Sequence, residues 1–272
     1  MLKTNNSNFL SETRKEQIEE LAEYIANYYS KRGAIDLEII AEKNNINFLY
    51  GNYEDYFDGL LQFEEDEFNI FINIDRLGHA YTERARFTFA HELGHYFIDN
   101  HRNALVSGLT PSHPSYTGFV SENIVEKEAD YFASCLLLPK ERIKQDCNKK
   151  KFSFNVLQEL SKKYQTSLTA TALRFATIGN HPIMVVYSVN NKVKWYWYST
   201  DFRFWSLKHG KERVPEDTAA GEYFNKGTKY NSPEIVFADD WFKVKFENDM
   251  ERRFYESCIY GNNGSVISIL WE

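Results

Sequence analysis

Two histidines and a glutamate in the segment HELGH are the residues of this chain whose spacing most directly suggests chemistry. His91 and His95 are four residues apart, so on a helix their imidazoles stand on one face, one turn apart, and can reach the same metal ion. Glu92 lies next to that face, where it could take a proton from an attacking water. Three protein ligands around Zn²⁺ would leave a fourth position open for that water. The pattern therefore predicts a Zn²⁺ site with His91 and His95 as ligands and Glu92 as the catalytic base.

The neighbours of this segment favour a metal site over two ordinary histidines. They are apolar, which predicts a buried helix: Phe87, Phe89, Ala90, Tyr96 and Phe97. Two histidines and a glutamate on a buried helix would be costly without a metal ion, because burying unpaired polar groups is unfavourable. Thr82 can cap the helix, which we expect to run to about Asp99.

The third ligand could be a histidine further along the chain. His101 stands six residues after His95, as in the pattern HExxHxxGxxH, where a glycine turns the chain back towards the metal. Here the glycine position is Ile98, a β-branched residue that resists positive φ. A helix that continues through Ile98 would carry His101 away from the ion, so the spacing disfavours His101 as a ligand.

A carboxylate from the next helix, predicted over residues 122–138, is the favoured third ligand. Glu126 and Asp130 are four residues apart and share a face with Ala129 and Ala133, whose small side chains would let two helices approach closely. Glu126 would then bind the metal, and Asp130 would accept the free N–H of a liganded histidine.

Two assignments near the site stay open in the sequence. Glu128 is the alternative carboxylate ligand, and otherwise we expect it to be a solvated surface charge. A donor that stabilises the oxyanion of peptide hydrolysis is also expected. The sequence does not choose among its candidates, which are His79, His101, His113, Tyr116 and Tyr131.

Several motifs occur in the order found in a known family. ARFTFAHELGHYF (85–97) and EKEADYFASCLLLP (126–139) resemble the two signatures of the ImmA/IrrE family of metallo-endopeptidases. Three upstream stretches are similar to that family as well: IDLEIIAEKNNINFLYG (35–51), DGLL (58–61) and IFINID (70–75). The resemblance covers about residues 35–178 and thins out after about residue 180.

This resemblance carries expectations about the site and the substrate. It implies zinc ligands at His91, His95 and Glu126, with Glu92 as the base. Asp130 stands where many members carry Asn, and either side chain can accept a hydrogen bond. Members typically cleave a DNA-binding repressor that controls mobile-element or stress genes, which implies a protein substrate with a helix-turn-helix domain.

The remaining patterns predict an α+β protein in three parts. Residues 1–139 would form a helical zincin-like peptidase domain with a small β-sheet, and residues 140–180 a helical extension resembling a helix-turn-helix. Residues 181–272 would form a β-rich C-terminal domain of unknown role. The predicted strands of the small sheet are 46–50, 59–63 and 68–74, and the predicted C-terminal hairpins turn at Asn190–Asn191 and at 261–264.

The helical extension raises the question of DNA binding. LSKKYQTSLTATALRF (160–175) has helix-turn-helix spacing, with a second helix that carries Arg174, and basic residues outnumber acidic ones over 140–180. The turn lacks the usual glycine, however, and the second helix is mostly Thr, Ala and Leu. Helices packed beside the peptidase core are therefore favoured over direct DNA contact.

Composition places further bounds on the protein. The chain has 272 residues and a formal net charge of -7, which does not favour a nucleic-acid or anionic-membrane surface. Its three cysteines fit no disulfide or metal framework, so we expect reduced thiols. The first residues lack the apolar core of a signal peptide, and no apolar run is long enough to span a bilayer. These features predict a cytoplasmic protein.

Two classes of function are compatible with this sequence. The first is a zinc-dependent endopeptidase that cleaves a helix-turn-helix repressor. The alternative is a zinc-stabilised sensor or adaptor that binds a repressor without cutting it. Glu92 favours the enzyme, because a protein that only binds has no need of a base at that position.

Overall fold

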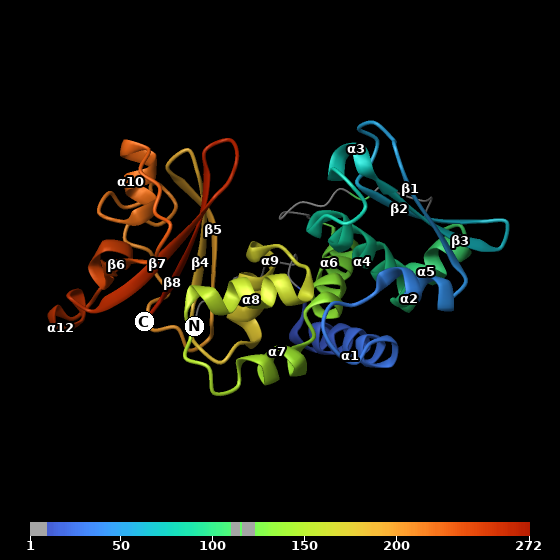
Figure 1. Ribbon diagram of the computed structural model, residues 1–272, viewed down its shortest axis with the longest axis horizontal. Coiled ribbons are helices and arrows are strands. Elements are labelled where there is room, and N and C mark those ends of the chain that lie inside the picture. The colour runs from blue at the N-terminus through green and yellow to red at the C-terminus, as the bar shows by residue number, and fades with distance from the viewer. Residues whose placement is uncertain (1–9, 110–114, 116–122) are drawn as a thin grey trace. The chain divides into compact units, whose positions relative to one another are not determined.

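The computed structural model describes residues 10–109, 115 and 123–272 and shows a mixed α+β protein (Figure 1). The chain divides into two compact units. The first unit comprises Met1–Arg142 and Ser161–Ser167, and the second comprises Ile143–Leu160 and Leu168–Glu272. The three-part division at residues 139 and 180 stays a prediction.

The first unit combines helices with a three-stranded sheet. Its helices are α1 (Glu12–Tyr29), α2 (Leu37–Lys43), α3 (Ile74–Leu77), α4 (Glu83–Phe97), α5 (Asp99–Val106) and α6 (Ile124–Leu137). Its strands are β1 (Ile46–Gly51), β2 (Gly59–Glu64) and β3 (Glu67–Asn73). β3 lies in the middle, parallel to β1 and antiparallel to β2, so β2 is an edge strand. The three predicted strands are confirmed.

Local sequence explains the β2–β3 hairpin. Glu65 and Asp66 both have positive φ, 52° and 61°, as a two-residue turn of the primed type requires. Along β3, Ile70 and Ile72 are fully buried while Phe71 between them is partly exposed. This alternation places one face of the sheet in the core of the unit.

The buried helix predicted around HELGH is α4. The Thr82 hydroxyl accepts a hydrogen bond from the Ala85 N–H at 3.0 Å and so caps its N-terminus, as predicted. α4 packs closely against α6. A Cβ added to Gly94 would lie only 3.2 Å from the Ala129 Cα, which shows how near the two helices are. The small residues on the two helices thus permit the close approach expected from the sequence.

The segment after α4 differs from the prediction. A further helix, α5, follows α4 almost directly. The chain leaves helical geometry at Ile98, where φ is -78° and ψ is 107°, and α5 starts at the next residue. The chain therefore turns without positive φ, and the prediction of a helix continuing through Ile98 is wrong. The next helix, α6, is capped by Asn123, whose side chain accepts a hydrogen bond from the Val125 N–H.

The second unit is built on a five-stranded antiparallel sheet with the order β5-β4-β8-β7-β6. Its strands are β4 (Met184–Val189), β5 (Lys192–Tyr198), β6 (Glu234–Phe237), β7 (Arg253–Tyr260) and β8 (Ser265–Trp271). Its helices include α9 (Leu168–Ile178), α10 (Ala219–Lys226), α11 (Ala238–Trp241) and α12 (Glu247–Met250). Both predicted C-terminal hairpins are confirmed, whereas β6 and the three short helices had no clear pattern in the sequence.

The helical extension consists of α7 (Lys140–Cys147), α8 (Phe154–Tyr164) and α9. Arg174, which the sequence offered for DNA contact, is 4% exposed. Thr177 is the one residue of α9 that is exposed rather than buried or partly buried. A buried guanidinium cannot reach a phosphate or a base edge, so α9 does not present this residue to DNA. No helix within the described part of the chain is both long and apolar enough to cross a membrane.

Candidate metal centre

Three side chains from two neighbouring helices converge at the predicted metal site. His91 and His95 stand one turn apart on α4, and Glu126 comes from the first turn of α6. The His91 Nε2 atom lies 3.1 Å from His95 Nε2 and 3.2 Å from Glu126 Oε2. His95 Nε2 lies 3.5 Å from Glu126 Oε1. These three residues form a group that could hold a metal ion.

The spacing of these atoms fits zinc. Tetrahedral ligands at about 2.0–2.1 Å from Zn²⁺ are separated from one another by about 3.3 Å. The three measured separations, 3.1, 3.2 and 3.5 Å, bracket that value. Two imidazole nitrogens and a carboxylate are also donor types that zinc accepts in open sites. The residues present therefore suit this ion both in chemistry and in distance.

The second nitrogen of His91 is held by Asp130. The distance from His91 Nδ1 to Asp130 Oδ1 is 2.8 Å. Burial lowers the pKa of His91, but the hydrogen bonds to Asp130 and Glu126 outweigh it and raise this pKa to about 10. The negative potential that retains a proton here would equally attract a metal cation. Asp130 thus lies where the sequence expected it, behind a histidine that could be a ligand.

The second nitrogen of His95, Nδ1, faces a histidine rather than a carboxylate. His95 Nδ1 lies 3.2 Å from His101 Nδ1, and His101 Nε2 lies 3.0 Å from Glu128 Oε2. Arg14 of α1 donates to both Glu128 oxygens, from Nε at 2.8 Å and from Nη2 at 2.5 Å. Burial lowers the pKa of His101, against the raising effect of Glu128. The turn at Ile98 therefore returns His101 to His95 on the side away from the metal-facing nitrogens.

Glu128 corrects the sequence prediction. The side chain was expected to be a solvated charge, but it is only 13% exposed and is paired with Arg14 and His101. Its carboxylate contacts His101, the histidine that lies behind His95. Of the two carboxylates considered as the third ligand, Glu126 is the one that the structure brings to His91 and His95.

Glu92 is buried beside the metal group, with 1% of its surface exposed. Its charge raises the pKa of His91, which places the carboxylate within electrostatic reach of that ring. Gly59, the first residue of β2, makes room for it, because a Cβ built there would lie 2.6 Å from Glu92 Oε1 and 2.5 Å from the Thr88 methyl carbon. A residue without a side chain is therefore needed at Gly59 for Glu92 to occupy this place.

Comparison with known proteins agrees with this geometry. Residues 52–176 match the family described as the IrrE N-terminal-like domain of the M78 peptidases. The chain carries an IrrE-like domain of the ImmA/IrrE metallopeptidase family. His91, His95, Glu126 and Glu92 all lie inside the matched range, whereas α1 precedes it.

A solved structure gives an independent likeness in fold. It is described as a Mycobacterium tuberculosis transcriptional regulator and is similar over 96% of this chain and 78% of its own, with a TM-score of 0.60. The sequence identity is 12%, so the likeness concerns the fold alone. The search of curated proteins gave no match.

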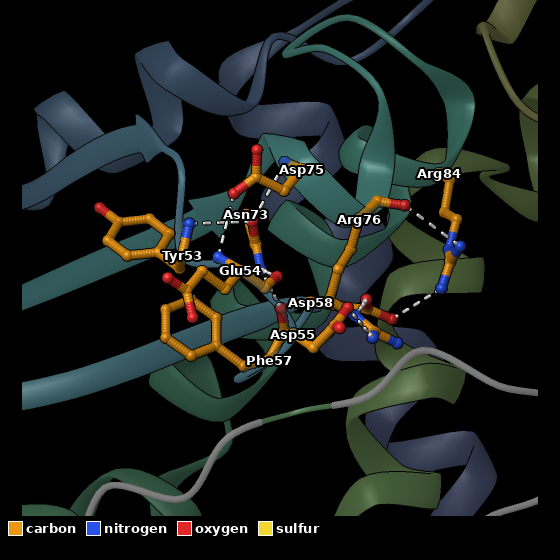
Figure 2. A network of polar contacts seen from close by, with 9 residues as sticks. All are labelled: Tyr53, Glu54, Asp55, Phe57, Asp58, Asn73, Asp75, Arg76 and Arg84. Atoms are coloured by element: carbon orange, nitrogen blue, oxygen red, sulfur yellow. Dashed lines mark hydrogen bonds and ion pairs between the residues drawn. The ribbon is translucent and has the colours of Figure 1, made fainter.

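A polar network fixes the start of β2 in the IrrE-like domain (Figure 2). Asp58 is fully buried and accepts hydrogen bonds from Arg76 Nε at 2.6 Å and Arg84 Nη2 at 2.9 Å. Asn73, at the end of β3, donates to the Phe57 and Glu54 carbonyls at 2.7 and 2.8 Å. The network holds the backbone immediately before Gly59, so it sets how closely β2 approaches Glu92.

The oxyanion candidates divide among different environments. His79 is exposed and accepts a hydrogen bond from the Tyr81 N–H, while His101 is buried behind His95. Tyr131 is partly buried on α6. His113 and Tyr116 lie outside the described residues. His79 and His101 do not belong to the group of side chains that could hold a metal ion, and no oxyanion donor is assigned in the IrrE-like domain.

Some residues near the centre had no assigned role in the sequence. Gly59 and Asp58 lie in DGLL, which the family resemblance singled out without saying what the two residues do. Arg14 and Glu128 are 114 residues apart, and no local pattern joins them. Only the packing of α1 against α6 brings this pair together.

Proposed function

We propose that this chain is a zinc-dependent endopeptidase. The observation that carries the proposal is the convergence of His91 Nε2, His95 Nε2 and the Glu126 carboxylate at 3.1 to 3.5 Å. Membership of a metallopeptidase family supports it. In this proposal the three residues are the ligands, Asp130 orients His91, and Glu92 is the catalytic base.

The proposed roles follow from the chemistry of each side chain. The chemistry that zinc supplies at such a site is Lewis acidity, which polarises the scissile carbonyl and acidifies the attacking water. Glu92 takes a proton from that water as its oxygen bonds to the carbonyl carbon. The same carboxylic acid then passes the proton to the amine nitrogen as the carbon–nitrogen bond breaks. Burial of Glu92 suits the first of these steps, because a desolvated carboxylate is a stronger base.

We further propose that the substrate is a DNA-binding repressor with a helix-turn-helix domain. Members of the ImmA/IrrE family typically act on such repressors, and the similar solved structure is described as a transcriptional regulator. Cleavage would separate the repressor from its operator and switch on the genes under its control.

The test is a cleavage assay with the helix-turn-helix repressor encoded nearest to this chain's gene. The zinc-loaded native protein is incubated with it beside the Glu92→Gln variant, and fragments are identified by mass spectrometry. A matched control is Glu83→Gln, which makes the same exchange at an exposed position of the same helix. We expect fragments with the native protein and Glu83→Gln, and a loss of about 10²–10⁴-fold in rate with Glu92→Gln.

The same experiment separates the enzyme from an adaptor. Glu92→Gln should still bind zinc and repressor, because the proposed ligands are intact. If the repressor is bound but left whole by the native protein, the chain acts by binding and the peptidase proposal fails. Repressor inactivation that survives Glu92→Gln would have the same consequence.

A further inference from the structure

We propose that His101, Glu128 and Arg14 form a positioning chain that holds His95 in the tautomer and orientation required of a metal ligand. The inference rests on the zinc site proposed above but not on its peptidase activity. Its basis is the unbroken series of contacts from His95 Nδ1 to His101, from His101 to Glu128, and from Glu128 to Arg14.

The donors and acceptors along this series alternate without conflict. A histidine that offers Nε2 to a metal carries its hydrogen on Nδ1. That hydrogen can be donated over 3.2 Å to His101 Nδ1, provided that this atom is unprotonated. The hydrogen of His101 is then on Nε2, 3.0 Å from a Glu128 oxygen that accepts it. Arg14 ends the series, because a guanidinium donates hydrogen bonds to Glu128 and cannot accept one.

The two histidines of the metal group are thus supported in different ways. His91 meets a carboxylate directly, with Asp130 at 2.8 Å. His95 meets its carboxylate, Glu128, through the intervening ring of His101. Histidines that bind metals are commonly fixed by a carboxylate on the second nitrogen, and losing such a partner typically lowers metal affinity or activity by about 10–100-fold. The neutral ring of His101, between His95 and Glu128, favours the same tautomer and orientation of His95 over a longer distance.

The positioning chain of His101, Glu128 and Arg14 also gives α1 a role in the metal centre. α1 packs against α6 but precedes the range that matches the IrrE-like family. Its Arg14 makes two hydrogen bonds to Glu128 across that contact, and the two side chains are 27% and 13% exposed. Bidentate pairing of a guanidinium with a carboxylate fixes direction as well as charge. Arg14 therefore orients Glu128 towards His101 rather than only holding α1 in place.

The test measures Zn²⁺ affinity by competition with a chromophoric chelator. His101→Phe keeps a ring but removes the acceptor, and we expect affinity to fall about 10-fold or more. Glu128→Ala should weaken binding in the same direction, and Arg14→Gln by less. His101→Asn, whose amide oxygen can still accept from His95, should recover part of the loss. Nitrogen-15 NMR of the metal-free protein should show the Nδ1–H tautomer of His95 in the native chain and its loss in His101→Phe.

Matched variants separate positioning from stability. Glu19→Gln breaks the ion pair of Glu19 with Lys140, another contact of α1, and should leave Zn²⁺ affinity unchanged. If it weakens binding as much as Arg14→Gln does, general loosening of α1 explains the effect and the inference fails. Glu128→Gln, which keeps the size of the side chain, serves if Glu128→Ala does not fold.

The outcomes also distinguish this inference from the zinc site itself. Native-like affinity and an unchanged His95 tautomer in His101→Phe would overturn the positioning chain and leave the zinc site standing. Failure of the native chain to bind Zn²⁺ any better than His95→Ala would overturn both.

Discussion

Each unit of the molecule contains a glutamate with little exposed surface, and the two carboxylates, Glu256 and Glu126, face different kinds of atom. Glu256 on β7 is fully buried, and both of its oxygens accept hydrogen bonds from the protein. Oε2 accepts from the Ala219 N–H at 2.9 Å and the Trp241 indole N–H at 3.1 Å. Oε1 accepts from the Ala220 N–H at 3.2 Å and the Ser268 hydroxyl at 2.7 Å. Burial raises the pKa of Glu256, and these donors oppose the rise.

Glu126 in the first unit faces imidazole nitrogens instead. Its oxygens lie 3.2 and 3.5 Å from the Nε2 atoms of His91 and His95, which also face each other at 3.1 Å. Lone pairs gathered in this way need a proton or a metal cation between them. Low exposure alone therefore does not make a carboxylate functional. Glu256 is surrounded by donors, as suits a structural role, whereas Glu126 belongs to a group that could hold a cation.

The largest difference should appear when the same exchange is made at both glutamates. With free Zn²⁺ at a hundred times its dissociation constant, binding stabilises a native fold by about 2.7 kcal/mol. Glu126→Gln should remove most of that stabilisation, while Glu256→Gln should keep it. The free energy of unfolding of each variant is measured by chemical denaturation with and without Zn²⁺. Equal zinc-dependent stabilisation in native and Glu126→Gln protein would contradict the assignment of Glu126.

Glu256→Gln should lower stability without reference to metal. One oxygen becomes an amide donor that faces either the Ala219 and Trp241 donors or the Ala220 and Ser268 donors. Leaving a buried donor unsatisfied costs about 1–3 kcal/mol, and we expect the free energy of unfolding of the second unit to fall by about 2 kcal/mol. Denaturant unfolding followed by tryptophan fluorescence tests this. A variant as stable as the native protein would show that the donors are not required.

Gly59→Ala tests the place of Glu92 in the first unit. The added methyl would meet Glu92 Oε1 at 2.6 Å and displace the carboxylate. We expect kcat to fall about tenfold, equivalent to about 1.4 kcal/mol, with Zn²⁺ affinity retained. Gly51→Ala is the control, because its added Cβ would meet only the Tyr53 ring. A native kcat in Gly59→Ala, or an equal loss in Gly51→Ala, would separate Gly59 from catalysis.

Ser268→Ala should have the smallest effect. It removes one donor of Glu256 and leaves the backbone and indole donors in place. One hydrogen bond of this kind contributes about 0.5–1.5 kcal/mol, so the loss should be clearly smaller than that of Glu256→Gln. The two variants are compared by the same unfolding measurement. A loss as large as that of Glu256→Gln would mean that the hydroxyl, rather than the whole set of donors, stabilises the carboxylate.

The sequence predicted well those features that depend on neighbours along the chain. The spacing of His91 and His95 is a helical repeat, and the predicted turns at Asn190–Asn191 and at 261–264 each join two adjacent strands, so both features are visible in a short window. The close approach of α4 and α6 was also predicted, because Ala129 and Ala133 are small, and the structure shows it at Ala129 and Gly94.

Contacts between residues that are far apart in the sequence were predicted less well. Glu128 was expected in solvent because its own helix gives no sign of Arg14 or His101. Ile98 was expected to continue the helix because its β-branch excludes positive φ, but the chain turned through extended geometry instead. The sequence was correct, by contrast, in favouring packed helices over DNA contact at Arg174, because Arg174 is buried.

The chemistry proposed for this protein can be inferred from the sequence alone, because ligand types and their helical spacing are local properties of HELGH and of the segment that carries Glu126 and Asp130. Tertiary packing was needed to find the groups that stand behind the proposed ligands and those that make room for the proposed base. His101 reaches His95, Arg14 reaches Glu128, and Gly59 lies against Glu92 because separate elements pack together. Packing selects such partners by shape and by the need to satisfy buried polar groups, and neither is written in the spacing of residues along one element.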